Sequence, residues 1–317
     1  MRIRFGYVAM ALGISQGSPN KTITVSNLSK IANPADQFSK LRRLVQENLS
    51  TQLRVLRYNI AHDIEVFRFT SKLVPLATHP MTAGWDYCKE FRSELAKIGE
   101  LVRQRQLRVS AHPDHFTILN SPESSVVEAA LADLHYHANL FDAMGLGADA
   151  KLVLHVGGLY KDKPQSLNRF KREFQRLPDK IRERIIIEND DKSYTARDVL
   201  TLCRQLKAPM VLDVHHHSCC NDDTNVADIL PAIFATWGGA TPKIHFSSPK
   251  GNGNIRAHAD YIKIDEFAAF LEIAKQCNQD FDVMVEAKQK DLSLLALIEE
   301  LKKVSGVTII NQAAIEY

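Results

Sequence analysis

The sequence predicts a closed (β/α)8 barrel, the TIM-barrel fold, and two observations favour this class. Short apolar runs rich in β-branched residues alternate with longer segments of helical period, a rhythm typical of a parallel sheet with crossover helices. Eight such units within 317 residues suit a barrel that closes on itself. The alternative, an open doubly wound sheet, has little support because no GxGxxG motif follows the first apolar run.

Each predicted strand is an apolar run bounded by polar or turn residues. The eight runs cover residues 3–9, 55–60, 107–113, 150–158, 184–190, 210–216, 243–248 and 282–288. Amphipathic helices are expected at 85–106, 124–145, 195–206, 265–277 and 291–304, because their apolar residues recur every three or four positions. No Pro/Gly/Ser-rich linker interrupts the pattern. We therefore expect a single domain over 1–317, with the barrel at about 2–303 and a tail of strand-like alternation at 304–317.

The composition limits which classes of binding partner and which cellular compartment we expect. Forty Lys+Arg against 37 Asp+Glu give a net charge of +3, which permits a nucleic-acid partner without demanding one. Five cysteines, two of them adjacent at Cys219 and Cys220, indicate free thiols and a reducing compartment. No leader segment and no apolar run of membrane-spanning length is visible. We expect a cytoplasmic protein with no membrane association.

Polar side chains gather where the predicted strands end, and the carboxyl ends of barrel strands carry the site in this fold. One histidine at a strand end is more often structural than functional, but here six consecutive strands end in imidazole or carboxylate groups. A further histidine lies in the glycine-rich loop after the seventh strand. The side chains concerned are His112, His155, Glu188, Asp213, His215, His216, His217, Lys243, His245, His258 and Glu286.

Mixed imidazole and carboxylate ligands suit Zn²⁺, Mn²⁺ or Fe²⁺, and this many groups favour two or three ions. Clustered divalent ions are suited to phosphodiester hydrolysis. A single ion held by Glu188, Asp213, His216 and Glu286 would instead suit a sugar isomerase or epimerase. A metal- or nucleic-acid-binding protein without catalysis is the third alternative, and the residues alone leave all three open.

Motifs over nearly the whole predicted barrel resemble those of the UV damage endonuclease family, DNA repair enzymes related to abasic-site endonucleases and xylose-isomerase-like barrels. They include "GYVAM" at 6–10, "LRYNI" at 56–60, "FRFTSKLVPLATHP" at 67–80, "SAHPDHF" at 110–116, "LVLHVGG" at 152–158, "IENDD" at 187–191, "LDVHHH" at 212–217, "KIHFSSP" at 243–249 and "VMVEAKQKD" at 283–291. The resemblance implies an endonuclease that nicks duplex DNA immediately 5′ to cyclobutane dimers and 6-4 photoproducts, and at abasic sites. Water activated by the metal cluster would leave 3′-hydroxyl and 5′-phosphate ends.

The same resemblance implies roles for individual residues. Manganese is the usual ion, with two or three bound, and zinc or another divalent metal is the alternative. Glu188 would bridge ions, Glu188 and Glu286 would hold them for catalysis, and Lys243 would lie near them as a lysine that the family can carboxylate. The implied ligands are His79, His112, His155, Glu188, Asp213, His216, His245, His258 and Glu286.

The resemblance also implies contacts to double-stranded damaged DNA by a monomer. His115 and Phe116 stand where the family inserts a polar–aromatic pair, usually Gln–Tyr, into the duplex, and the less favoured alternative is that Phe116 is a core residue of its loop. Tyr7 matches an aromatic residue beside the damaged bases. Lys250 and Arg256, in the loop after the seventh strand, are candidate phosphate contacts.

The stretch "LDVHHHSCCND" at 212–222 poses the sharpest local question. Strict strand alternation would put Asp213, His215 and His217 on one face and His216 on the other. The family pattern selects His216 as the ligand. The two agree if the strand ends at Asp213 and the chain turns, because a turn returns positions i and i+3 to one side. We then expect His215 and His217 to support the ligands rather than bind metal.

Overall fold

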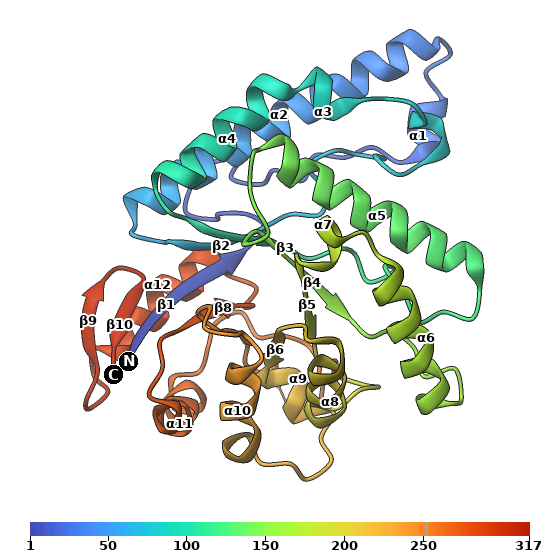
Figure 1. The fold of residues 1–317 in the computed structure, drawn as a ribbon. Helices are drawn as coiled ribbons and strands as arrows, with labels where there is room; N and C mark the ends of the chain where they lie inside the picture. Colours follow the sequence, from blue (N-terminus) through green and yellow to red (C-terminus); the bar gives the residue numbers. More distant parts are fainter. Residues whose placement is uncertain (252) are drawn as a thin grey trace.

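In a computed structural model, which describes residues 1–251 and 253–317, eight parallel strands close into a barrel surrounded by helices (Figure 1). The strands are β1 (Arg2–Val8), β2 (Val66–Phe69), β3 (Arg108–Ala111), β4 (Lys151–His155), β5 (Ile185–Glu188), β6 (Met210–Asp213), β7 (Lys243–Phe246) and β8 (Phe281–Val285). They pair in chain order from β2 to β8, then β8 pairs with β1 and β1 with β2. The predicted (β/α)8 barrel is confirmed.

The predicted second strand is wrong. Residues 55–60 lie within the long helix α2 (Pro34–Ala61), and the second strand is β2, at Val66–Phe69. Buried positions in α2 include Val45, Leu49, Gln52, Leu56 and Asn59, which keep the spacing of three and four residues of a helix. A six-residue apolar run fits both structures in isolation, and only the periodicity of the longer segment distinguishes them.

The predicted helices are present with shifted ends, and further helices complete the outer layer. The segment at 85–106 is interrupted at Phe91, which separates α3 (Tyr87–Glu90) from α4 (Arg92–Gln104). The helices besides α2 are α1 (Val25–Ser29), η1 (Pro80–Thr82), α3 (Tyr87–Glu90), α4 (Arg92–Gln104), α5 (Ser124–Ala143), α6 (Lys163–Arg176), α7 (Asp179–Arg182), α8 (Ala196–Leu206), α9 (Val214–Cys219), α10 (Val226–Ala235), α11 (Ile264–Ala274), η2 (Lys275–Cys277) and α12 (Lys290–Leu301). Among the described residues, none of these is both long enough and apolar enough to cross a lipid bilayer.

The tail forms a hairpin that joins the barrel sheet. Strand β10 (Ala314–Glu316) runs antiparallel to Arg2–Arg4 of β1, and β9 (Thr308–Asn311) pairs with β10. Because residues 3–7 of β1 also pair with β8, β10 must share the other edge of β1 with β2. The two chain ends therefore lie side by side (Figure 1), with the Met1 amino group donating to the Tyr317 carbonyl at 2.9 Å.

The strands that carry most candidate site residues are deeply buried. Every residue of β5, β6, β7 and β8 is buried, as expected for parallel strands covered on both faces. Their register aligns the polar ends, because His155 is paired with Glu188 and Asp213 with His245. The barrel thus presents these side chains at one level of its carboxyl end.

Candidate active site

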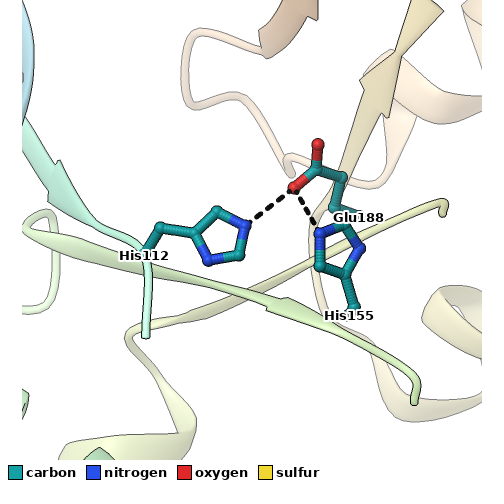
Figure 2. A group of neighbouring side chains, drawn as sticks. All are labelled: His112, His155 and Glu188. Carbon is teal, nitrogen blue, oxygen red and sulfur yellow. Dashed lines mark hydrogen bonds and ion pairs between the residues drawn. The ribbon is translucent and has the colours of Figure 1, made fainter. Parts of the chain in front are cut away.

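Glu188 is the centre of the candidate site. One of its carboxylate oxygens, Oε2, lies 3.3 Å from His112 Nε2 and 3.5 Å from His155 Nε2. Figure 2 shows both imidazoles directed at that single oxygen from β4 and from the end of β3. Three ligand-type atoms from three neighbouring strands therefore converge on one small space.

The second oxygen of Glu188 belongs to another group. Glu188 Oε1 lies 2.8 Å from His245 Nδ1, and Glu286 Oε1 lies 3.1 Å from the same nitrogen. Glu188, Asp213, His245 and Glu286 each offer a ligand atom, and these atoms all lie within 4.8 Å of one another. Glu188 is therefore the residue that the two groups share.

The three consecutive histidines point in different directions, as the turn predicted after Asp213 requires. Strand β6 ends at Asp213, which caps α9 by accepting the His216 N–H at 2.7 Å. This turn brings His216 Nδ1 to 3.6 Å from Glu188 Oε1. His215 packs its ring edge-on against His258, with centroids 5.2 Å apart, and His217 contacts the Thr224 carbonyl at 3.0 Å. Only His216 of the three turns toward Glu188.

His258 reaches the same region from the loop after β7. Its Nδ1 lies 2.7 Å from the Glu286 carbonyl oxygen, and its ring centroid lies 6.1 Å from that of His216. A backbone contact of this kind fixes one ring nitrogen and leaves the other free to act as a ligand.

Two carboxylates at the site are held in the charged form despite deep burial. Burial alone would raise the pKa of Glu188, but His245 and His155 hold that pKa well below its usual range. Burial also opposes ionisation of Glu286, whose pKa is nevertheless lowered by Arg68 and His245. Both groups are therefore anionic ligands at neutral pH.

Asp213 and His216 form a second electrostatic pair. Burial raises the pKa of Asp213 to about 6, with Glu188 adding to the rise and His216 opposing it. Burial would lower the pKa of His216, but Asp213, Glu188 and Glu286 raise it to about 9. In the metal-free protein the surrounding carboxylates thus keep His216 protonated. A cluster of carboxylates with this effect favours the binding of a cation.

The residues present fit a divalent cation. Buried polar atoms normally have hydrogen-bond partners, yet Oδ2 of Asp213, a member of the second group, is buried without one. A metal ion satisfies carboxylate and imidazole lone pairs together, and the donor set of nitrogen and oxygen is shared by zinc, manganese and iron sites. The described residues thus fit a metal cluster, but their donor atoms do not identify the metal.

Besides His216 and His258, two further residues predicted for the metal site, His79 and Lys243, lie outside both ligand groups. His79 caps η1, where its Nδ1 accepts the Met81 N–H at 3.1 Å, and it lines a cavity with Asp114 and Phe116. Lys243 begins β7 and is 1% exposed. Its ammonium donates to the Ser110 hydroxyl at 3.2 Å. Burial, and to a lesser degree Arg108, lower the pKa of Lys243 to about 7 against the opposing effect of Asp282.

The predicted DNA contacts divide by exposure. Phe116 is 48% exposed beside the exposed His115, with ring centroids 5.8 Å apart, so Phe116 is not a core residue. Tyr7, in contrast, is fully buried, and its hydroxyl donates to Asn59. Tyr7 therefore offers no exposed surface to DNA in this conformation.

Lys250 and Arg256 lie in the loop after β7. Both side chains are exposed, and Arg256 pairs with Asp191 at 2.6 Å. Each keeps donors that face solvent and can meet a phosphate.

Two residues that sequence reasoning missed complete the site. Arg68, on β2, forms an ion pair with Glu286. Asn189 is buried and brackets Asp213, donating to the Asp213 carbonyl and accepting its N–H, both at 2.9 Å. Misplacing the second strand hid the role of Arg68, but both residues stand inside quoted motifs, Arg68 in "FRFTSKLVPLATHP" and Asn189 in "IENDD", and could have been found there.

Comparison with known proteins decides the family. The sequence profile of the family described as UV-endonuclease UvdE matches residues 3–317. The chain belongs to this family. Its UV-endonuclease relatives include the UV DNA damage endonuclease of Bacillus thuringiensis subsp. konkukian (strain 97-27), which is 39% identical over 319 residues, with all of both chains covered. The resemblance seen in the sequence motifs is confirmed.

Solved structures agree with this assignment. The crystal structure of SacUVDE superposes with a TM-score of 0.84 at 31% identity, covering 95% of this chain and 98% of the other. Endonuclease IV from Thermus thermophilus superposes with a TM-score of 0.59 at 13% identity, over 95% and 100% of the two chains. At that identity the second likeness concerns the fold alone. Membership of the UV-endonuclease family places the protein among DNA repair nucleases.

Proposed function

We propose that the protein nicks double-stranded DNA immediately 5′ to ultraviolet photoproducts by hydrolysing the phosphodiester, leaving 3′-hydroxyl and 5′-phosphate ends. The observation that carries the proposal is the sharing of Glu188 between two groups of ligand atoms. A shared carboxylate suits a pair of ions across which an in-line displacement at phosphorus takes place. Cyclobutane dimers, 6-4 products and abasic sites are the proposed substrates, and the protein acts on them as a monomer.

The chain would hold the ions with residues of the two groups, together with His216 and His258 beside them. Divalent ions bound there, with manganese proposed as the resident metal, would lower the pKa of a bound water and neutralise charge on the phosphate. Glu188 and Glu286 supply the negative charge that retains the ions, because neighbouring cationic groups keep both carboxylates ionised. Arg68 fixes the carboxylate of Glu286 by its ion pair. His79 as a further ligand and Lys243 as a catalytic residue remain part of the proposal.

Recognition of the lesion is assigned to the exposed His115–Phe116 pair. An exposed aromatic ring at the end of the barrel that carries the candidate metal site can occupy the gap left when damaged nucleotides leave the base stack. Unstacking costs least where base pairing is already weakened, so deformability of the duplex contributes to selectivity. Lys250 and Arg256, which lie on the loop that carries His258, would contact DNA phosphates.

The test is a plasmid-nicking assay with purified protein, Mn²⁺ and UV-irradiated supercoiled DNA, with EDTA and unirradiated DNA as controls. We expect lesion-dependent nicking that EDTA abolishes. Glu188→Gln should reduce nicking by at least about a hundredfold while the fold is retained. Glu128→Gln, the same change at an exposed position of α5, is the matched control and should nick normally.

Two outcomes would contradict the proposal. Lesion-independent or absent nicking by the unaltered protein would overturn the repair function and return the sugar isomerase or epimerase alternative to consideration. Normal nicking by Glu188→Gln would overturn the bridging role of this carboxylate.

A further inference from the structure

Exposed apolar side chains concentrate at the end of the barrel that carries the candidate metal site. Among the described residues, the large hydrophobic side chains with high exposure are Leu12, Phe116, Tyr160, Ile255, Tyr261 and Ile310. All except Ile310 lie in loops that follow the carboxyl ends of β1, β3, β4 and β7. A concentration of this kind around a polar site marks a contact surface.

Tyr160 stands out in this set because its backbone is strained. The Asp162 N–H donates to the Leu159 carbonyl at 3.0 Å, so Tyr160 and Lys161 are the two central residues of a turn. Both have positive φ, 48° and 62°. Turns with positive φ at both central positions normally select glycine, asparagine or aspartate. A tyrosine and a lysine are therefore retained there against the local preference of the backbone, a pattern typical of functional sites.

The turn directs its side chains outward but holds the tyrosine ring in place. Tyr160 is 40% exposed and Lys161 is exposed. The Arg169 guanidinium, from α6, lies over the Tyr160 ring at 5.3 Å from its centroid. A ring that is held by a cation over one face and packs beside Gly158, yet remains 40% exposed, is prepared to stack on a planar group at low entropic cost.

A buried brace connects this loop to the loop of His115 and Phe116. Asn120, which is fully buried, donates to the Gly158 carbonyl at 2.8 Å and accepts the Gly158 N–H at 3.2 Å. Arg169 in turn donates to the Asn120 carbonyl at 2.8 Å. The two loops and α6 are therefore one hydrogen-bonded unit, and the Tyr160 and Phe116 rings are presented from the same rigid support.

We propose that Tyr160 is a second aromatic DNA contact, which stacks on a base of the bound duplex while Lys161 contacts a phosphate. This inference rests on the proposed nuclease function and deepens it, because it assigns a positioning residue outside the metal cluster. Stacking on a base is sequence-tolerant, since every base has a π-face. The contact would hold the duplex across the loops while the His115–Phe116 pair engages the lesion.

The test compares Tyr160→Gly with Tyr160→Phe in the nicking assay on a UV-irradiated duplex. Tyr160→Gly should raise KM on the order of tenfold with little change in kcat, because a stacking contact is lost and the metal cluster is untouched. Tyr160→Phe should retain the KM of the unaltered protein. The melting temperature of Tyr160→Gly should not fall markedly, because glycine relieves the positive-φ strain. A ring that serves folding alone predicts a marked fall in melting temperature with KM unchanged.

Two further variants complete the design. Lys161→Gln should weaken binding on damaged and undamaged duplex alike and reduce the slope of log K against log salt by about 0.9. Ile310→Ala, which removes an exposed apolar side chain from β9, should leave KM unchanged. An unchanged KM in Tyr160→Gly with normal nicking by the unaltered protein overturns this inference alone. Absence of nicking by the unaltered protein overturns the proposed function and the inference with it.

Discussion

A buried aspartate lies at each end of the barrel, and the two differ in their hydrogen-bond partners. At the amino end, Asp282 on β8 is fully buried and accepts from Arg4 at 2.8 Å and from Arg108. At the carboxyl end, Asp213 is equally buried, but its Oδ2 has no hydrogen-bond partner. Both oxygens of the carboxylate at the amino end accept from guanidinium groups, whereas the carboxylate at the carboxyl end keeps one oxygen without a hydrogen bond, with His216 Nδ1 3.7 Å away.

This difference separates a stability element from a binding element. Neutralising one member of a buried ion pair leaves the other members without a partner, which is costly. Neutralising a carboxylate that is already unsatisfied removes little native-state stabilisation but removes a metal ligand. The same substitution, aspartate to asparagine, should therefore affect different properties at the two ends.

The largest effect is expected from Asp282→Asn. Arg4 and Arg108 would lose their shared carboxylate, so the free energy of unfolding should fall by about 3–5 kcal/mol. Chemical denaturation monitored by circular dichroism measures the change. Nicking per folded molecule should remain near that of the unaltered protein. An activity loss larger than the loss of folded protein would show that the amino end also serves catalysis.

Asp213→Asn should give the complementary result. Nicking should fall by at least about a hundredfold, as for loss of a metal-binding group. The unfolding free energy of the metal-free protein should change by no more than roughly 1 kcal/mol, because asparagine caps α9 as well as aspartate does. Metal titration by calorimetry provides a second readout, and normal metal stoichiometry in this variant would remove Asp213 from the ligand set.

A smaller effect concerns pH in the metal-free protein. The pKa of His216 is raised to about 9, above its value of about 6.5 in an unfolded chain. Its stabilising contribution is thus complete below pH 6.5 and is lost as pH rises through 9, by on the order of 3 kcal/mol. Denaturation at a series of pH values measures this slope.

Two variants and a metal titration sharpen the pH result. His216→Gln should lack the slope, whereas Asp282→Asn should keep it, because that change lies at the other end of the barrel and leaves the carboxylates around His216 in place. Divalent metal affinity should show the reverse trend and rise with pH, since a ligand histidine must first lose its proton. A slope that persists in His216→Gln would assign the titration to another group.

Several features could be read from the sequence because they depend on local pattern. The alternation of strands and helices predicted the barrel, and the polar strand ends predicted which side chains would converge. The family pattern at 212–217 agreed with strand alternation only if the chain turns after Asp213, and α9 supplies that turn. The tail was correctly read as strand-like, although its partner β1 lies at the other end of the chain.

Other features depended on contacts between distant segments. Residues 55–60 are helical because the whole of α2 packs as one helix. The second strand is therefore β2, which places Arg68 beside Glu286. Tyr7 resembles a base-contacting residue by motif, but burial against Phe67, with ring centroids 5.1 Å apart, made it a core residue. Asn189 became a bracket for Asp213 through the pairing of β5 with β6.

The sequence by itself determined the class of fold and the chemical nature of the candidate ligand atoms, because periodicity and residue type carry this information locally, and its motifs indicated the family. Only the tertiary structure decided that Glu188 belongs to two groups of ligand-type atoms, and that one buried aspartate has both oxygens hydrogen-bonded while another has one oxygen without a hydrogen bond. The physical reason is that hydrogen-bond satisfaction depends on which groups meet across the barrel, and neighbours in space are not neighbours in the chain.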